Sequence, residues 1–80
     1  MTKLAVIWEC IKRNLPRGRW VELGEIYRIV GSNLSLDRED FQWESPSSYI
    51  PKWKQNVRNV LQYRKRTGEI EWDGQARYRI

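Results

Sequence analysis

The stretch PKWKQNVRNVLQYRKRTG, residues 51–68, decides how this chain of 80 residues is organised. Its apolar side chains recur at helical intervals, at Trp53, Val57, Val60 and Leu61. That spacing is typical of a helix that buries one stripe against a core. Pro51 suits the first helical turn, where its missing N–H is not needed, and Gly68 suits the position after a helix end. The sequence therefore predicts an amphipathic helix from about Pro51 to Thr67.

The opposite face of this helix is basic and polar. At 100° per residue, the side chains farthest from Val57 are Lys52, Gln55, Asn59, Gln62 and Arg66, flanked by Arg58 and Lys65 on one side and by Asn56 and Tyr63 on the other. Residues 45–68 contain no Asp or Glu, whereas residues 31–44 carry four acidic residues against one Arg, namely Asp37, Glu39, Asp40 and Glu44 against Arg38. The positive charge of the chain, +5 in total, is therefore concentrated on one element.

These side chains predict contact with the major groove of double-stranded DNA. Asn and Gln can bridge adenine N6 and N7, and Arg and Lys can reach guanine O6 and N7 or the flanking phosphates. A surface helix built only for solubility more commonly alternates Glu with Lys four residues apart. We therefore expect base reading by this helix. Phosphate contact without base reading, and a merely solvated face, are the alternatives.

Two shorter helices are predicted before this one. The first runs from Thr2, as its N-cap, to Asn14, and one face of it is a buried apolar stripe formed by Leu4, Ile7, Trp8, Ile11 and Leu15. After Pro16 and Gly18, residues 20–22 form a short extended segment. The second helix carries Leu23, Ile26, Ile29 and Val30, and ends at Gly31 as a left-handed C-cap.

Residues 32–49 are predicted to be an ordered loop with one helical turn at most, because turn-forming Asn, Asp, Ser and Pro are frequent there. The apolar side chains that would hold this loop to the core are Leu34, Leu36, Phe41 and Trp43. Ser47, Ser48 and Tyr49 lie just before the long helix. They either cap that helix or donate to a phosphate near its positive N-terminal end.

Alternating apolar and charged residues from 69 to 80 predict a C-terminal β-hairpin. A two-residue turn at Asp73-Gly74 would place apolar side chains opposite polar ones. A three-residue loop of residues 72–74 matches apolar with apolar and acid with base, because it pairs Ile70 with Ala76, Glu71 with Gln75 and Glu69 with Arg77. In this register Trp72 lies at the hairpin tip beside Gln75, where both would touch DNA, or folds back over the hairpin as core.

The predicted order is helix, short strand, helix, loop, helix and hairpin, with the short strand edging the hairpin in a three-stranded sheet. This α+β order in a single domain of residues 1–80 resembles the winged-helix domains attached to restriction endonucleases and HNH-type nucleases of bacteria. The matching motifs are Leu15-Pro16, Val21-Glu22-Leu23, Glu25-Ile26-Tyr27, Trp53, Val57-Arg58-Asn59-Val60-Leu61-Gln62, Gly68-Glu69-Ile70 and Tyr78. The resemblance implies that the third helix enters the major groove and that the hairpin, as a wing, touches the flanking backbone. It also implies a role as the targeting domain of a nuclease or as a small regulator, and a link to restriction-modification.

The composition argues against catalysis within this chain. There is no His, and a nucleophilic Cys10 would lack a base, so we expect no catalytic residue, no metal site and no cofactor. Cys10 is expected to be an ordinary, partly buried thiol. The single cysteine, the absence of an apolar run of about 18 residues and the absence of a signal peptide predict a cytoplasmic protein without membrane contact.

The expected partner is double-stranded DNA, with a nuclease domain elsewhere in a longer protein as a further partner. The alternative is a winged-helix protein-interaction module that does not bind DNA. That module would use the acidic segment of residues 37–44 and exposed aromatic side chains such as Trp43.

Overall fold

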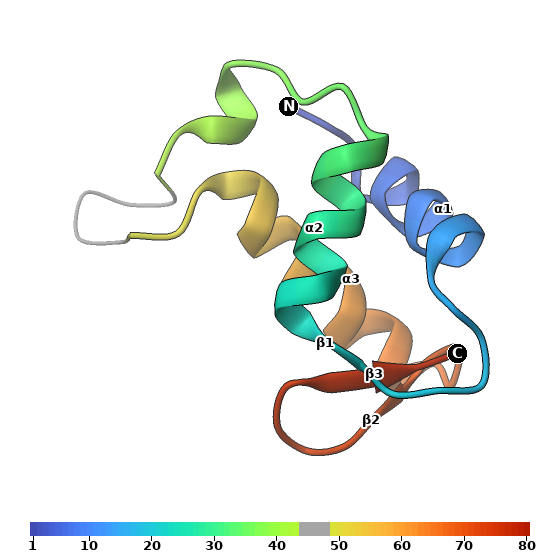
Figure 1. Ribbon diagram of the computed structural model, residues 1–80. Coiled ribbons are helices and arrows are strands. Elements are labelled where there is room, and N and C mark those ends of the chain that lie inside the picture. Colours follow the sequence, from blue (N-terminus) through green and yellow to red (C-terminus); the bar gives the residue numbers. More distant parts are fainter. Residues whose placement is uncertain (44–48) are drawn as a thin grey trace.

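The computed structural model describes residues 1–43 and 49–80. These residues form three α-helices, α1 (Leu4–Asn14), α2 (Leu23–Asn33) and α3 (Lys52–Arg66), and one 3-10 turn, η1 (Glu39–Phe41). Three short strands, β1 (Val21–Glu22), β2 (Glu71–Trp72) and β3 (Arg77–Arg79), form an antiparallel sheet in the order β1-β3-β2. The architecture is a small α+β fold (Figure 1), and the prediction that a short strand edges the hairpin is confirmed.

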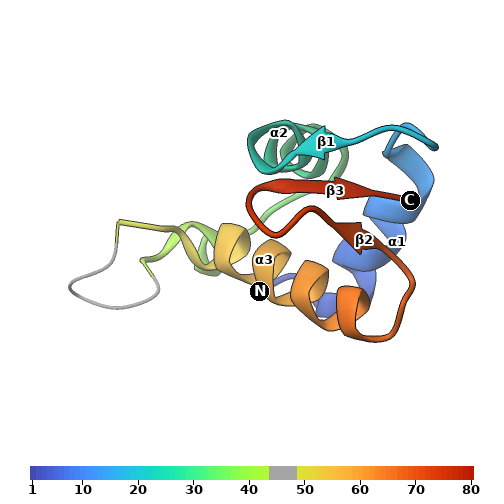
Figure 2. The ribbon, with the colours of Figure 1, turned by 90° about the horizontal axis from the view of Figure 1, so that it is seen from below.

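The three helices and the sheet are arranged so that α3 lies at the β2 side of the sheet. Seen from below, β1, β3 and β2 lie side by side, with α2 next to β1 and α3 beyond β2 (Figure 2). The segment that leads into β1 and helix α3 therefore lie on opposite sides of the sheet. Within residues 1–43 and 49–80, no helix combines the length and the apolar character that crossing a bilayer requires.

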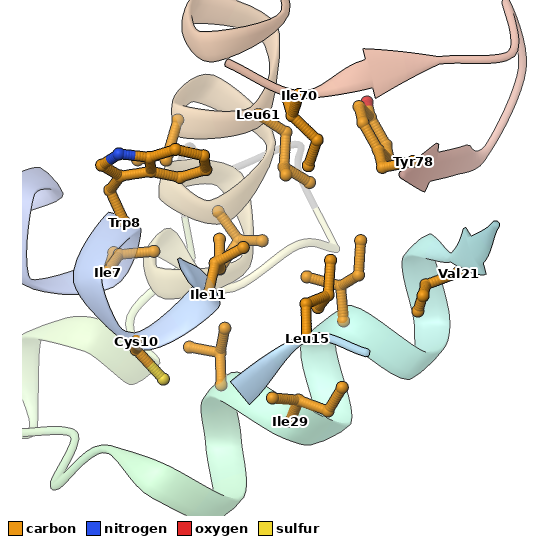
Figure 3. Close-up of a cluster of buried hydrophobic side chains, with 14 of the residues drawn as sticks. Ile7, Trp8, Cys10, Ile11, Leu15, Val21, Ile29, Leu61, Ile70 and Tyr78 are labelled. Atoms are coloured by element: carbon orange, nitrogen blue, oxygen red, sulfur yellow. The ribbon is translucent and has the colours of Figure 1, made fainter. Parts of the chain in front are cut away.

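The core fills the space between the helices and the inner face of the sheet (Figure 3). α3 contributes the four buried residues that its apolar spacing predicted, and α1 contributes Ile7, Trp8, Cys10 and Ile11. Leu4 was expected in the same stripe, but this expectation is wrong because the side chain is 49% exposed. It lies in the first turn of α1, where it lines an open pocket between α1 and α3 rather than the core.

The predicted N-terminal cap of α1 is wrong. The helix begins at Leu4, and Lys3 occupies the cap position without a side-chain hydrogen bond. Thr2 donates instead to the carboxylate of Asp40, from its N–H to Oδ1 at 2.9 Å and from its hydroxyl to Oδ2 at 2.8 Å. The Thr2 hydroxyl therefore joins the chain start to η1 rather than capping α1.

The predicted end of α2 at Gly31 is also wrong, because the helix continues to Asn33. Gly31 lies inside the helix beside α3, and a Cβ built on it would lie 3.5 Å from Cη2 of Trp53, an ordinary van der Waals distance. The amide of Asn33 donates to the carbonyl of Ile29 at 2.8 Å and covers the last turn. Gly31 therefore does not end the helix, and the space beside it admits a larger side chain than that of glycine.

The hairpin register is shifted relative to the prediction. Trp72 pairs with Tyr78, and Glu71 pairs with Arg79, so the expected pairing of Glu71 with Gln75 is wrong. The three-residue loop runs over 74–76, beginning at Gly74 with φ of +89°. The side chain of Asp73 sets this position, because its Oδ1 accepts from the N–H groups of Gln75 at 2.8 Å and of Arg77 at 3.1 Å. These hydrogen bonds, first that from Gln75, lower the pKa of Asp73.

The shift preserves the side chains' faces, because strand side chains alternate with a period of two. Tyr78 in β3 lies opposite Val21 of β1 on one side and opposite Trp72 on the other, all toward the core side. On the outer face, Arg77 is paired with Glu22 at 3.4 Å and Arg79 with Glu71 at 2.5 Å. The expectation that apolar residues meet apolar ones, and acids meet bases, therefore holds in a different register.

The segment between α2 and α3 contains one short helical turn, η1, within its described part. Leu34 and Leu36 pack against the core as expected, but Phe41 and Trp43 are 58% and 56% exposed and do not hold the segment down. Asp40 does so, since it is fully buried and accepts hydrogen bonds from Thr2 and from the N–H of Asp37. The predicted roles of Ser47 and Ser48 lie outside the described residues.

Candidate nucleic-acid interface

The outer face of α3 carries most of the residues that the sequence assigned to DNA. Arg58, Asn59, Tyr63 and Arg66 are exposed, and the other assigned residues of this helix are half-buried along its flanks, namely Lys52, Gln55, Asn56, Gln62 and Lys65. Because the opposite face of the helix is held by the core, this set of side chains is displayed on a rigid element. The helix ends at Arg66 with Thr67 as its C-cap, and Gly68 follows with φ of +80°, which fits its predicted place after the helix end.

Gln62 has a partner inside the protein. Its amide nitrogen donates to the hydroxyl of Tyr78 at 2.8 Å, and the Tyr78 side chain is buried. Gln62 was expected to face outward with the other polar residues of α3, but it is half-buried and joins α3 to β3. The bond fixes the position of the hairpin relative to the helix.

Trp72 folds back over the hairpin, which is the second of the two positions that the sequence allowed. Its ring stacks on Tyr78 with centroids 6.5 Å apart, and its Nε1 donates to the carbonyl of Gln75 at 2.9 Å. The ammonium of Lys65 lies 4.5 Å from the centre of the same ring. Trp72 therefore packs on Tyr78 and is hydrogen-bonded to the hairpin loop, whereas Gln75 is exposed on that loop.

Gln55 and Asn59 form a side-chain pair one helical turn apart. The Nε2 of Gln55 donates to Oδ1 of Asn59 at 3.1 Å. This leaves the amide nitrogen of Asn59 as a donor and the amide oxygen of Gln55 as an acceptor. A donor beside an acceptor matches the N7 and N6 groups that adenine presents in the major groove.

Each carboxylate within the described residues is already engaged. Seven acidic side chains form ion pairs. The pairs are Glu9 with Lys12, Glu22 with Arg77, Glu25 with Arg28, Asp37 and Glu39 with the N-terminal ammonium, Glu69 with Arg64, and Glu71 with Arg79. The two others, Asp40 and Asp73, accept backbone N–H groups. The acidic side chains are thus neutralised or hydrogen-bonded locally.

The cations of α3 are in the opposite situation. Among residues 1–43 and 49–80, five of them form no ion pair: Lys52, Lys54, Arg58, Lys65 and Arg66. Arg64 is the exception, since it bonds to Glu69 at 2.8 Å and lies 5.1 Å from the ring centre of Trp8. The unpaired charges follow one helix over its whole length, which makes α3 the strongest concentration of available positive charge.

The side of α3 toward α1 is hollowed rather than flat. Asn59 and Tyr63 line a pocket of about 240 Å³ together with Leu4, Trp8 and Arg64. The pocket lies beside the outer face and is mostly apolar. The exposed side chain of Leu4 contributes to this pocket rather than to the buried stripe of α1.

Two residues at this interface were missed at the level of sequence. Tyr78 was named only among the motifs of the resemblance, yet its hydroxyl orients Gln62. Lys54 was not assigned to the site, and its ammonium lies 5.1 Å from the ring centre of Tyr27. The period-two pattern of the hairpin could have indicated the inward position of Tyr78, but not the partner of its hydroxyl.

Cys10 is buried, as expected for an ordinary thiol, and burial raises its pKa. Within the described residues, no group of three or more His, Cys, Asp or Glu side chains is placed to hold a metal ion. Comparisons with protein families, with curated proteins and with solved structures give no match to this chain.

Proposed function

We propose that this chain is a winged-helix domain that binds double-stranded DNA, with α3 in the major groove and the β2–β3 hairpin as the wing. One observation carries the proposal. The Asp and Glu side chains of the described residues are all engaged, yet five of the six cations of α3, all except Arg64, have no acidic partner among residues 1–43 and 49–80. A row of uncompensated charges on one rigid helix is the electrostatic footprint of a polyanion site.

The neutral polar centre of α3 supports sequence reading in addition to phosphate binding. Asn59 and Gln55 together offer a donor and an acceptor with the pattern that adenine requires. Arg58 is exposed next to them and can reach guanine O6 and N7 on a neighbouring base pair. Lys52 and Arg66, at the two ends of the helix, are assigned to phosphates.

The hairpin supports a second contact with the same duplex. Gln75 is exposed on the loop, and Trp72 and Lys65 hold that loop beside the C-terminal half of α3. A loop in this place touches the backbone that borders the groove occupied by α3. The resemblance to nuclease-attached domains supports a role for this binding in the targeting of a nuclease or in a small cytoplasmic regulator.

The test is a titration of a fluorescent duplex of about 20 base pairs at several salt concentrations. If Lys52, Lys54, Lys65 and Arg66 each contact a phosphate, the slope of log K against log salt is about −3.6. A duplex selected from a randomised pool should bind more tightly than the starting pool if α3 reads bases. Absence of binding to any duplex at low salt contradicts the proposal.

A protein-interaction module is the second candidate, and one observation favours it. Phe41, Trp43 and Tyr49 are 58%, 56% and 89% exposed near the N-terminal end of α3. Trp43 is held there by a bridge to Pro51, and the N–H of Lys52 donates to the carbonyl of Gln42 at 2.8 Å. If no duplex binds, substitution of Trp43 should instead weaken binding to a protein partner.

A further inference from the structure

A second group of unpaired cations lies outside α3. Residues 10–21 contain no acidic residue, and three arginines there are exposed, namely Arg13, Arg17 and Arg19. None of the three forms an ion pair within the part of the chain that the structure describes. In contrast, Lys12, Arg28, Arg64, Arg77 and Arg79 all have acidic partners.

The turn that carries Arg17 and Arg19 follows α1, whose last turn carries Arg13, and this turn is fixed to the sheet. The N–H of Gly18, at φ of +79°, donates to the carbonyl of Ile80 at 2.8 Å. The guanidinium of Arg17 donates to the carbonyl of Lys12 at 3.0 Å. Beyond the turn, the half-exposed ring of Trp20 lies 4.6 Å from the guanidinium carbon of Arg79. The positive charges are therefore displayed at a defined place.

The end of α1 explains only part of this charge. Lys12 and Arg13 lie in the last turn of α1, where cations stabilise the helix dipole. Arg17 and Arg19 lie beyond the helix and have no such role. Arg19 adds to the lowering of the pKa of Glu25, but the first cause of that shift is the hydrogen bond from Arg28, which occupies the carboxylate.

This turn and α3 lie at opposite edges of the sheet. The turn leads into β1, whereas the ammonium of Lys65 in α3 lies 4.5 Å from the ring centre of Trp72 in β2, the strand at the other edge. Figure 2 shows β1 and the segment before it at the edge farthest from α3. A duplex that receives α3 in its major groove lies on the outer side of that helix, away from β1.

We propose that Arg13, Arg17 and Arg19 form a second phosphate-binding surface, through which one chain holds a second DNA duplex. Arginine suits this role because its planar guanidinium binds phosphate oxygens in pairs. The exposed face of Trp20 beside the turn adds an aromatic surface for a sugar or base. The inference rests on the proposed function, because the first duplex is the one bound by α3.

The test measures how many duplexes one chain holds. Native mass spectrometry of the whole chain with short duplexes should show one chain with two duplexes. Duplexes labelled separately with donor and acceptor dyes should show energy transfer when the protein is added. The triple variant R13Q/R17Q/R19Q should retain one duplex and lose both signals. Thermal unfolding of each variant checks that the fold is kept.

A matched control separates the position of the charge from its amount. The variant K3Q/R28Q/R38Q also removes three exposed positive charges and should behave as the unmodified chain does. The variant R58Q/K65Q/R66Q should still bind one duplex weakly. Adding R13Q/R17Q/R19Q to this variant should abolish the remaining binding.

Two outcomes overturn the second surface while the proposed function stands. In the first, R13Q/R17Q/R19Q lowers the salt slope for a single duplex by about 2.7, which places the arginines on the same duplex as α3. In the second, the variant changes neither slope nor stoichiometry. Failure of the unmodified chain to bind any duplex overturns the second surface together with the proposed function.

Discussion

The two faces of α3 differ in how their side chains are held. On the inner face, Trp53, Val57, Val60 and Leu61 are buried against α1, α2 and the sheet. On the outer face, Arg58 and Arg66 extend from the same backbone with no ion-pair partner among the described residues. The inner face thus stabilises the fold, and the outer face contributes charge that the fold does not need. Substitutions on the two faces should therefore separate stability from binding.

The largest effect is expected on the inner face. Leu61→Ala removes a fully buried side chain and should lower the free energy of unfolding by about 2 to 5 kcal/mol, since the surrounding core relaxes only in part. Urea unfolding followed by fluorescence measures this loss. Arg58→Ala is the matched outer-face control and should change stability by about 0.5 kcal/mol at most. Equal losses for both variants would contradict the division between the faces.

The inner face could be predicted from the sequence, because its period of 3.6 residues depends only on the α3 residues themselves. The end of α2 could not be predicted in the same way. Gly31 looks like a cap when only the local sequence is considered, but the helix continues through it to Asn33. Helix propensity is a weak local preference, so a glycine does not by itself set the end of a helix.

The hairpin register and the buried Asp40 needed information that the local pattern does not contain. Alternation fixes which residues share a face, but the loop position depends on two hydrogen bonds to the side chain of Asp73. The buried carboxylate of Asp40 accepts from the N–H of Asp37 nearby, but its two other donors come from Thr2, 38 positions away. Which residues form the candidate interface could be predicted from the sequence. The hydrogen bond from Gln62 to Tyr78 could not be predicted, because it depends on the hairpin register.

The next effect should fall on sequence preference. Asn59→Ala removes the donor of the amide pair, and it should weaken binding to a selected duplex by about 1 to 3 kcal/mol while changing random DNA little. Competition titrations against both duplexes measure the difference. Gln55→Ala should give a loss in the same direction, because it leaves Asn59 without its internal partner. A loss of the same size on both duplexes would assign Asn59 to the phosphates instead.

A smaller effect is expected where the two faces meet. Tyr78→Phe removes the hydroxyl that accepts from Gln62 and should cost about 0.5 to 1.5 kcal/mol of stability. Because Phe keeps the aromatic ring in the core, this substitution tests the hydroxyl alone, whereas Ala would also remove the ring. Chemical denaturation gives the loss, and the side-chain amide signal of Gln62 in an NMR spectrum reports the broken bond. An unchanged amide signal would show that Gln62 does not depend on Tyr78.

The smallest effect is expected from single phosphate contacts, and two neighbouring cations allow a matched test. Lys65→Ala and Arg66→Ala should each reduce the magnitude of the salt slope by about 1 and weaken all duplexes alike. Only Lys65→Ala should also move the indole N–H signal of Trp72, because the ammonium of Lys65 lies over that ring. If Lys65→Ala moves the indole signal but leaves the slope unchanged, its charge serves the hairpin, and Lys65 belongs with the inner face rather than the outer one.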